Sequence, residues 1–373
     1  MSINRRSFIK KASYLVGGLT LAPPLSCAPM EESNSPVKKT KRKYGVALVG
    51  LGYYSSDVLA PALQETKNCY LAGIVTGTPE KEKIWTEKYN IKPKNIYNYS
   101  NFDSIKNNPE IDYVYIVLPN SMHKEYTIRG ALAGKHVLCE KPMALNAEEC
   151  REMISVCKNE NRKLSIGYRM HYDLTTQKIK EMAKEQPFGK IKYIHAAAGF
   201  TAPPHMYSNW RFNKELGGGA MMDMGVYSIQ AARYSIGTEP LAVLSALDTT
   251  YDKENYKNVD QGMIFQLEFP DNIFANLMTS FACRINDLNI TTEKGWYRLK
   301  PFSSYKGVKG ESKLGPINFP SINQQAAHMD DFAYSIENDT NPLVPGEEGL
   351  RDMIIVDGIR KSLIIKDRVD LEI

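Results

Sequence analysis

Two pairs of residues have the types and spacing of a site that could stabilise charge and move a proton. Glu140 and Lys141 stand side by side in CEKPMAL, directly after the apolar residues HVL, which are typical of a buried strand. Asp223 and Tyr227 are four residues apart in a stretch typical of a helix, so they share one face of it. An ammonium beside a reacting oxygen stabilises developing charge, and a phenol can exchange a proton. The alternative for Lys141 is an ordinary surface lysine. The alternative for Asp223 and Tyr227 is a hydrogen bond on the helix surface without a role in chemistry.

A glycine motif indicates where a nucleotide could bind. Residues 44–50 form an apolar stretch typical of a strand, and GLGYYS, residues 50–55, follows directly before a predicted helix. The two glycines permit a tight turn and let backbone amides approach a pyrophosphate at a helix N-terminus. Ser55 replaces the third glycine of the usual fingerprint. The strand-turn-helix context favours a dinucleotide over a turn without ligand. The expected contacts from this loop are Gly50, Gly52, Tyr53 and Tyr54.

The end of the second predicted strand, IVTGTPEK, indicates which nucleotide binds. NAD-binding proteins usually end this strand with an acid that bonds the ribose 2′-hydroxyl. Here Thr76, Gly77 and Thr78 offer hydroxyl and amide donors, and Lys81 follows one turn into the next helix. These groups suit a 2′-phosphate, so the sequence favours NADP. NAD remains the alternative if Lys81 is only a solvated helix lysine.

Apolar strands alternate with amphipathic helices from residue 44 onward. This alternation predicts a parallel sheet covered on both faces, with ligands outside the carboxyl ends of its strands. The expected strands are residues 44–50, 69–75, 111–118, 135–140 and 163–168. After Gly167 the spacing of apolar residues changes to the period of two that predicts antiparallel strands. These are residues 190–200, 242–251, 261–269 and 273–282, before a final helix at 345–364. The fold class is therefore α/β: a doubly wound, parallel Rossmann sheet followed by an α+β domain with a mostly antiparallel, open sheet.

The motifs GLGYYS, LPNSMHKE, AGKHVLCEKPM and IGYRMH, in this order, resemble the glucose-fructose oxidoreductase/inositol dehydrogenase family (Gfo/Idh/MocA). The resemblance extends from about Tyr44 to the C-terminus. The stretch NWRFNKELGGGAMMDMGVYSIQAARYSIGTEP is similar to the glucose-fructose oxidoreductase branch of this family. The resemblance implies hydride transfer between NADP and a small-molecule sugar or polyol.

It also implies roles for individual residues. Lys141 would contact the sugar hydroxyl or carbonyl that is interconverted, and Glu140 would meet the nicotinamide ribose. Tyr227 would exchange the proton at the substrate oxygen, because the family has histidine here in many members and tyrosine in the glucose-fructose type. Asp223 would orient the sugar. The other cofactor contacts implied are Pro119, Asn120, His123, Arg169, Trp210 and Arg211. His123 could equally be a helix cap or a surface residue.

Two further functions remain open at this stage. An NAD(P)-dependent glycoside hydrolase would oxidise C3 of the sugar transiently and reduce it again. A non-catalytic sensing module would leave Lys141 and Tyr227 without a chemical role. For the oxidoreductase, export from the cytoplasm would favour a tightly bound cofactor that is recycled in place.

The N-terminal segment has the features of an export signal. NRRSFIK followed by ASYLVGGLTLA resembles a twin-arginine signal, which predicts a folded, periplasmic protein recognised by the twin-arginine export machinery. The apolar run has eleven residues, and a spanning helix needs about 20. Cys27 could carry a lipid, although Pro24 and Leu25 fit a lipobox poorly. The predicted organisation is a signal at 1–30, a linker at 31–43, a dinucleotide-binding domain at 44–166 and a substrate and oligomerisation domain at 167–373.

Charge and composition narrow the range of partners. The chain of 373 residues is long enough for two domains, and its net charge is +5. Residues 1–43 hold nine basic and two acidic residues, which leaves 38 basic and 40 acidic residues in the rest. This balance predicts no nucleic-acid partner.

The six cysteines lack metal-ligand spacing, so we expect no metal site. The open sheet predicts a homodimer or homotetramer.

Overall fold

The computed structural model describes residues 42–373. The expected export signal, Cys27 and most of the expected linker lie outside the described residues. Between residues 42 and 373, no helix combines the length and apolarity needed to cross a membrane.

The first sheet has six parallel strands in the order β3-β2-β1-β4-β5-β6. Its strands are β1 (Tyr44–Val49), β2 (Cys69–Val75), β3 (Ile96–Tyr97), β4 (Tyr113–Ile116), β5 (His136–Cys139) and β6 (Leu164–Ile166). This order is that of a Rossmann sheet. It confirms the fold class expected for the first half of the chain. The strand that the sequence did not predict, β3, is only two residues long.

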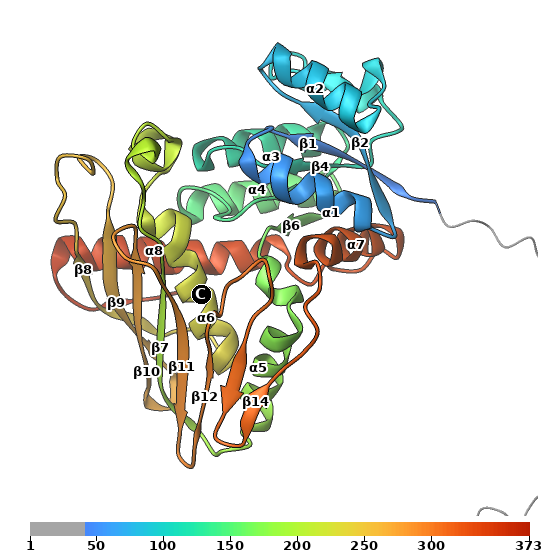
Figure 1. Ribbon diagram of the computed structural model, residues 1–373. Coiled ribbons are helices and arrows are strands. Elements are labelled where there is room, and N and C mark those ends of the chain that lie inside the picture. The colour runs from blue at the N-terminus through green and yellow to red at the C-terminus, as the bar shows by residue number, and fades with distance from the viewer. Residues whose placement is uncertain (1–41) are drawn as a thin grey trace, which may run out of the picture. The chain divides into compact units, whose positions relative to one another are not determined.

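Helices cover both faces of this sheet, and one of them comes from the C-terminal part of the chain (Figure 1). The helices are α1 (Ala60–Glu65), α2 (Pro79–Tyr89), α3 (His123–Leu132), α4 (Ala147–Asn159) and α7 (Gln324–Glu337). Val46 and Leu48 of β1 pack with α1 and α7 on one face, where the ring centres of Tyr113 and Phe332 are 5.1 Å apart. On the other face, α3 lies beside α4. Helix α7 therefore completes the core of the first sheet, although it lies far along the sequence.

Helix α4 buries two of the cysteines. The helix begins after Asn146, whose side chain accepts the N–H of Glu149, and it buries Cys150, Met153 and Cys157 at helical spacing. The five cysteines within residues 42–373 are all free. In that same range, no group of three or more His, Cys, Asp or Glu residues could hold a metal ion.

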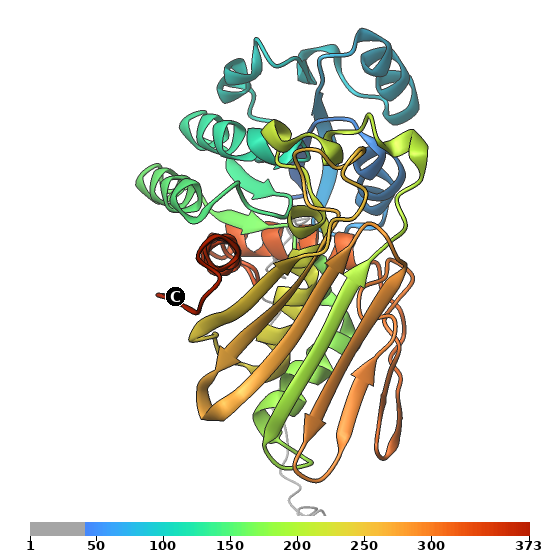
Figure 2. The same ribbon diagram turned by 90° about the vertical axis from the view of Figure 1, so that its left-hand side faces the viewer.

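The second sheet has nine strands in the order β14-β13-β12-β11-β7-β10-β9-β8-β15. The strands are β7 (Ile191–Gly199), β8 (Ala242–Asp248), β9 (Gly262–Phe269), β10 (Ile273–Ser280), β11 (Ile285–Thr292), β12 (Trp296–Leu299), β13 (Gly310–Ser312), β14 (Gly315–Ile317) and β15 (Val369–Asp370). All neighbours are antiparallel except β7 and β10. Helices α5 (Leu174–Glu185), α6 (Val226–Ile236) and α8 (Gly346–Ile365) pack on one face. The opposite face, turned to the viewer in Figure 2, carries no helix of the described residues.

A buried ion cluster joins α6 to α8. Arg233 is 5% exposed, and its Nη1 lies 2.7 Å from the carboxylate of Asp352, which is fully buried. Glu348 and Glu239 also accept from this guanidinium, at 3.0 and 2.5 Å. The cluster thus fixes the helix that bears Tyr227 against the helix that runs between the two sheets.

Replacing Asp352 with alanine should lower the free energy of unfolding by about 3–5 kcal/mol, because a buried guanidinium loses a fully buried partner. Urea denaturation followed by circular dichroism would measure the change. As a control, Glu181→Ala removes an exposed pair with Lys178 and should cost less than about 1 kcal/mol. A cost for Asp352→Ala no larger than that of the control would contradict the prediction.

Candidate active site

The candidate site lies where the carboxyl ends of the parallel strands meet. Gly50 follows β1, Glu140 and Lys141 follow β5, and Gly167 follows β6. Strands β1, β4, β5 and β6 are parallel neighbours, so the turns after them line one edge of the sheet. Ligands of doubly wound sheets bind at this edge.

The glycine turn after β1 has the backbone geometry that a pyrophosphate site needs. Gly50 has φ +91°, and a Cβ there would lie 2.5 Å from the carbonyl oxygen of Val117. A Cβ on Gly52 would have no atom within 4 Å, so the space above the turn is open. Ser55 is buried and donates from Oγ to the Gly50 oxygen at 2.6 Å, which explains how serine replaces the third glycine. These residues fit the phosphates of a dinucleotide.

Two π-helical segments lie at the site, and the sequence did not predict either. The first is Tyr54–Leu59, after which the N–H of Ala60 donates to the Ser55 oxygen. Pro61 is the second residue of α1, where its missing N–H is tolerated, so the wider π-helical turn ends where the α-helix begins. The second segment is Met221–Gly225, directly before α6.

The residues after β2 lie close to the glycine turn. The three residues between β2 and α2 carry no carboxylate. Thr76 is buried, and its Oγ1 accepts the N–H of Thr78 at 3.2 Å. Lys81 reaches back and donates from Nζ to the Leu51 oxygen at 2.8 Å. Lys81 is therefore tied to the glycine turn, where it could meet a phosphate on the adenosine side of a dinucleotide.

Glu140 and Lys141 are neighbours in sequence, but their charged groups have different partners. The carboxylate of Glu140 accepts from the hydroxyl of Tyr115 at 2.6 Å. Lys141 donates from Nζ to the backbone oxygen of Asp223 at 2.7 Å and lies 3.4 Å from its Oδ1. A Cβ on Gly167 would lie 2.6 Å from Glu140 Oε1, so a larger residue there would have to displace this carboxylate. Burial raises the pKa of Glu140. Glu140 is therefore held against β4 through Tyr115, whereas Lys141 is held against the residues that precede α6.

Asp223 holds two cations. Its Oδ2 accepts from Nε of Arg211 at 2.7 Å, while Lys141 approaches Oδ1. Burial acts to raise the pKa of Asp223, but the charges of Arg211 and Lys141 outweigh it and keep the pKa below its ordinary value. Asp223 is therefore ionised at neutral pH and fixes the ammonium of Lys141 in position.

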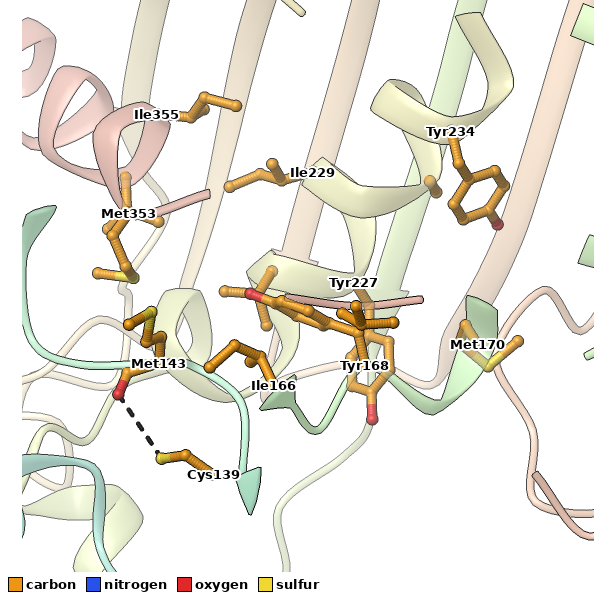
Figure 3. Packing of buried hydrophobic residues seen from close by; sticks show 14 of the residues in the cluster. Cys139, Met143, Ile166, Tyr168, Met170, Tyr227, Ile229, Tyr234, Met353 and Ile355 are labelled. Carbon is orange, nitrogen blue, oxygen red and sulfur yellow. Dashed lines mark hydrogen bonds between the residues drawn. The ribbon is translucent and has the colours of Figure 1, made fainter. Parts of the chain in front are cut away.

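Tyr227 lies at the border between the hydrophobic core and the charged groups. Its side chain is 8% exposed and belongs to the same buried cluster as Ile166 and Tyr168 (Figure 3). Nζ of Lys141 lies 4.7 Å from the centre of its ring, and Cζ of Arg169 lies 5.6 Å from it. The structure thus brings Lys141, Asp223 and Tyr227, the three residues that the sequence analysis expected to be catalytic, close together.

Asn120 and His123 have structural partners. Asn120 is buried and donates from Nδ2 to the Gly217 oxygen at 2.7 Å. His123 is fully buried, with its ring nitrogens 2.8 Å from the oxygen of Pro142 and 2.9 Å from that of Leu118. Burial lowers the pKa of His123, although the two carbonyl acceptors act to raise it. His123 is therefore not a surface residue, and its ring links the turns after β4 and β5. Its expected contact with the nicotinamide edge stays a prediction.

The remaining expected contacts differ in exposure. Trp210 is half-buried, with the guanidinium of Arg211 4.6 Å from its ring centre. Pro119 is half-buried between β4 and α3. Tyr53 is 71% exposed, whereas Tyr54 is half-buried and accepts from Nε2 of Gln325 at 3.3 Å. Of the two tyrosines in the glycine turn, Tyr54 is the one held within the site.

Arg169 anchors a loop that sequence reasoning missed. It is 4% exposed, and its guanidinium donates to Ser303 Oγ at 3.1 Å and to the Ser304 oxygen at 2.9 Å. Gln324, at the start of α7, also accepts from it. Cζ of Arg169 lies 4.1 Å from the ring centre of Tyr305. The loop sequence SSY carries no motif, so only the fold could reveal Tyr305 as a site residue.

Comparisons with known proteins agree with this architecture. The model of the oxidoreductase family with an NAD-binding Rossmann fold (GFO_IDH_MocA) matches residues 44–168, and that of the GFO/IDH/MocA C-terminal domain matches residues 176–298. A crystal structure of aldose-aldose oxidoreductase from Caulobacter crescentus is 36% identical with a TM-score of 0.85, covering 88% of this chain and 100% of that one. D-xylose 1-dehydrogenase [NADP(+)] from Haloarcula marismortui is 26% identical over 87% of this chain and 92% of its own length. 1,5-Anhydro-D-fructose reductase from Ensifer adhaerens is 24% identical over 66% of this chain and 76% of its own.

Proposed function

The chain belongs to the GFO/IDH/MocA oxidoreductase family, and we propose that it transfers a hydride between NADP and a sugar or polyol. It is an NAD(P)-dependent enzyme whose relatives include named sugar dehydrogenases and reductases. The observation that carries the proposal is the meeting of the Lys141 ammonium and the Tyr227 ring, 4.7 Å apart, beside the ionised Asp223.

Each residue of the site has a physical part in this reaction. Lys141, fixed by Asp223, places positive charge where the substrate oxygen gains negative charge. The Oη of Tyr227 would exchange the proton with that oxygen. A bound NADP would supply the hydride acceptor or donor, held by the glycine turn, Glu140 and Lys81. The site thus divides charge stabilisation, proton exchange and cofactor binding among different side chains.

NADP is favoured over NAD by the residues after β2. They offer hydroxyl and amide groups, and the Lys81 ammonium lies at the Leu51 oxygen of the glycine turn. A 2′-phosphate binds a cation of this kind, whereas the ribose hydroxyl of NAD is usually held by a carboxylate.

Replacing Lys81 with alanine should weaken NADP binding by about tenfold, because one charge-assisted contact is lost. NAD binding should change less than about twofold, since NAD has no 2′-phosphate. Titration of the cofactor-free protein with each nucleotide, followed by tryptophan fluorescence, measures both constants. Equal weakening for NAD and NADP would mean that Lys81 only stabilises the glycine turn.

The cofactor is further proposed to stay bound and to be recycled in place. The expected twin-arginine signal supports this, because an exported enzyme would have little access to free NADP. The purified protein should then carry a nicotinamide absorbance that one sugar removes and another restores. A protein that is isolated without nucleotide and is active only with added NADP would contradict the proposal that the cofactor stays bound. Release of nitrophenol from nitrophenyl glycosides without a second redox substrate would instead indicate the hydrolase.

Export itself is proposed from residues 1–30 and can be tested separately. Replacing Arg5 and Arg6 with lysine should retain the protein in the cytoplasm, as measured by cell fractionation. Unchanged periplasmic recovery would contradict a twin-arginine route.

A homodimer or homotetramer is proposed through the open face of the nine-stranded sheet. Phe274 pairs with Tyr193 across β10 and β7, and both are exposed on this face, at 42% and 38%. Apolar surface of this kind is usually covered by a partner. Light scattering of the wild type and of Phe274→Glu would test the interface, and a monomeric wild type would refute it.

A further inference from the structure

A pair of aromatic rings, called the notch below, lies near Lys141 and Tyr227. It consists of Tyr54, from the glycine turn, and Tyr305, from the loop between β12 and β13, with ring centres 6.1 Å apart and planes inclined by 39°. Tyr305 is 50% exposed, although its ring rests on the buried guanidinium of Arg169. A half-exposed ring supported from behind presents a surface to a ligand.

The notch is held in place by the first two residues of α7. Gln324 accepts from Arg169 and donates from Nε2 to Asp173 at 2.8 Å, while Gln325 donates to the hydroxyl of Tyr54 at 3.3 Å. The loop of Tyr305 is tied to the same Arg169 through Ser303 and Ser304. Both rings are therefore oriented before any ligand arrives, which lowers the entropy lost on binding.

The notch is close to the reacting groups. The guanidinium of Arg169 lies 4.1 Å from the ring centre of Tyr305 and 5.6 Å from that of Tyr227. A molecule whose oxygen meets Tyr227 and Lys141 would therefore extend toward Tyr305. A phenol ring offers an apolar face and a hydroxyl, and a sugar ring offers C–H groups and hydroxyls that match both.

We propose that Tyr305, with Tyr54, forms the wall on which the sugar ring of the substrate rests, so that Tyr305 determines how tightly each sugar binds. This inference rests on the proposed sugar oxidoreductase function. Tyr305 comes from the part of the chain that supplies Asp223 and Tyr227, and not from the strand ends of the Rossmann sheet. This origin favours the sugar over the nicotinamide as the occupant of the notch.

The test uses the holoenzyme and three variants, with steady-state kinetics and direct binding of a panel of aldoses by calorimetry. Tyr305→Ala should raise KM and the dissociation constant of the preferred sugar by ~10-fold, because stacking and a hydrogen bond are lost. Tyr305→Phe keeps the ring on Arg169 and should raise both by only ~3-fold. In both variants kcat and the bound NADP, measured by absorbance, should stay near the wild-type values. Tyr70→Ala, a half-exposed tyrosine at the start of β2 on the opposite edge of the sheet, is the control and should change nothing.

The outcomes separate the inference from the function on which it rests. Wild-type holoenzyme that binds and oxidises no sugar would overturn both. Normal activity with equal sugar affinity in Tyr305→Ala and the control would overturn only the notch. Loss of bound NADP in Tyr305→Ala, with sugar affinity preserved, would assign the ring to the cofactor and overturn the notch as a sugar site. A selective loss of sugar affinity in Tyr305→Ala, with the smaller loss in Tyr305→Phe, would support it.

Discussion

Replacing Lys141 with methionine is expected to lower kcat for sugar oxidation by roughly 1000-fold, while the protein keeps its fold and its nucleotide. The ammonium is the cation that Asp223 directs toward Tyr227, at 2.7 Å from the Asp223 oxygen and 4.7 Å from the Tyr227 ring centre. Methionine has a similar length but no charge, so the negative charge that develops on the substrate oxygen loses the ammonium that stabilises it. Arg211 stays bonded to Asp223, so that carboxylate retains a cation. Single-turnover kinetics monitored through the nicotinamide absorbance would measure the chemical step directly.

A surface lysine provides the control for this change. Lys178 is 33% exposed and pairs with Glu181 on α5, away from the strand ends. Lys178→Met should leave kcat within about twofold of the wild type, because exposed pairs contribute little. If Lys141→Met retained more than about a tenth of the wild-type kcat with full nucleotide content, electrostatic stabilisation by this ammonium would not be the main source of rate.

The position of Lys141 could be predicted from spacing along the chain, because ligands of a parallel sheet bind outside the carboxyl ends of its strands. Lys141 follows a buried strand, so the fold class alone placed it at the carboxyl ends. Asp223 and Tyr227 required the family resemblance, since helical spacing puts them on one face but does not say which element they face. In the structure, Lys141 Nζ contacts the carboxylate of Asp223 and, at the shorter distance, its backbone oxygen. The shorter contact uses a main-chain group, which no side-chain pattern reports.

The parts that the sequence could not predict depend on contacts between distant segments. Tyr305 is a site residue only because Arg169, after β6, holds its loop through Ser303. Tyr115 points from within a strand to Glu140, and a strand pattern gives the face of a residue but not its partner. The surroundings of His123 could not be predicted for the same reason. A histidine at a helix start has several possible surroundings, and here two carbonyl oxygens enclose it.

Replacing Tyr227 with phenylalanine should lower kcat by about 100- to 1000-fold, because the substrate oxygen loses the phenol as its proton donor and acceptor. Phenylalanine preserves the packing, since the ring belongs to the buried cluster that contains Ile166 and Tyr168. It also preserves the cation–π contacts with the ring, whose centre lies 4.7 Å from Lys141 Nζ and 5.6 Å from Arg169 Cζ. The loss should therefore appear in kcat, with sugar affinity changed less than about threefold.

Tyr234, one heptad further along α6, is the matched control for this substitution. It is also buried, and among the described residues its hydroxyl has no hydrogen-bond partner. Tyr234→Phe removes the same atom from the same helix, so it should leave kcat unchanged and stability equal or slightly higher. A solvent isotope effect on kcat that is present in the wild type and altered in Tyr227→Phe would link the loss to the proton step. If both variants lost activity equally, the cause would be the packing of α6, and Tyr227 would have no special part in proton exchange.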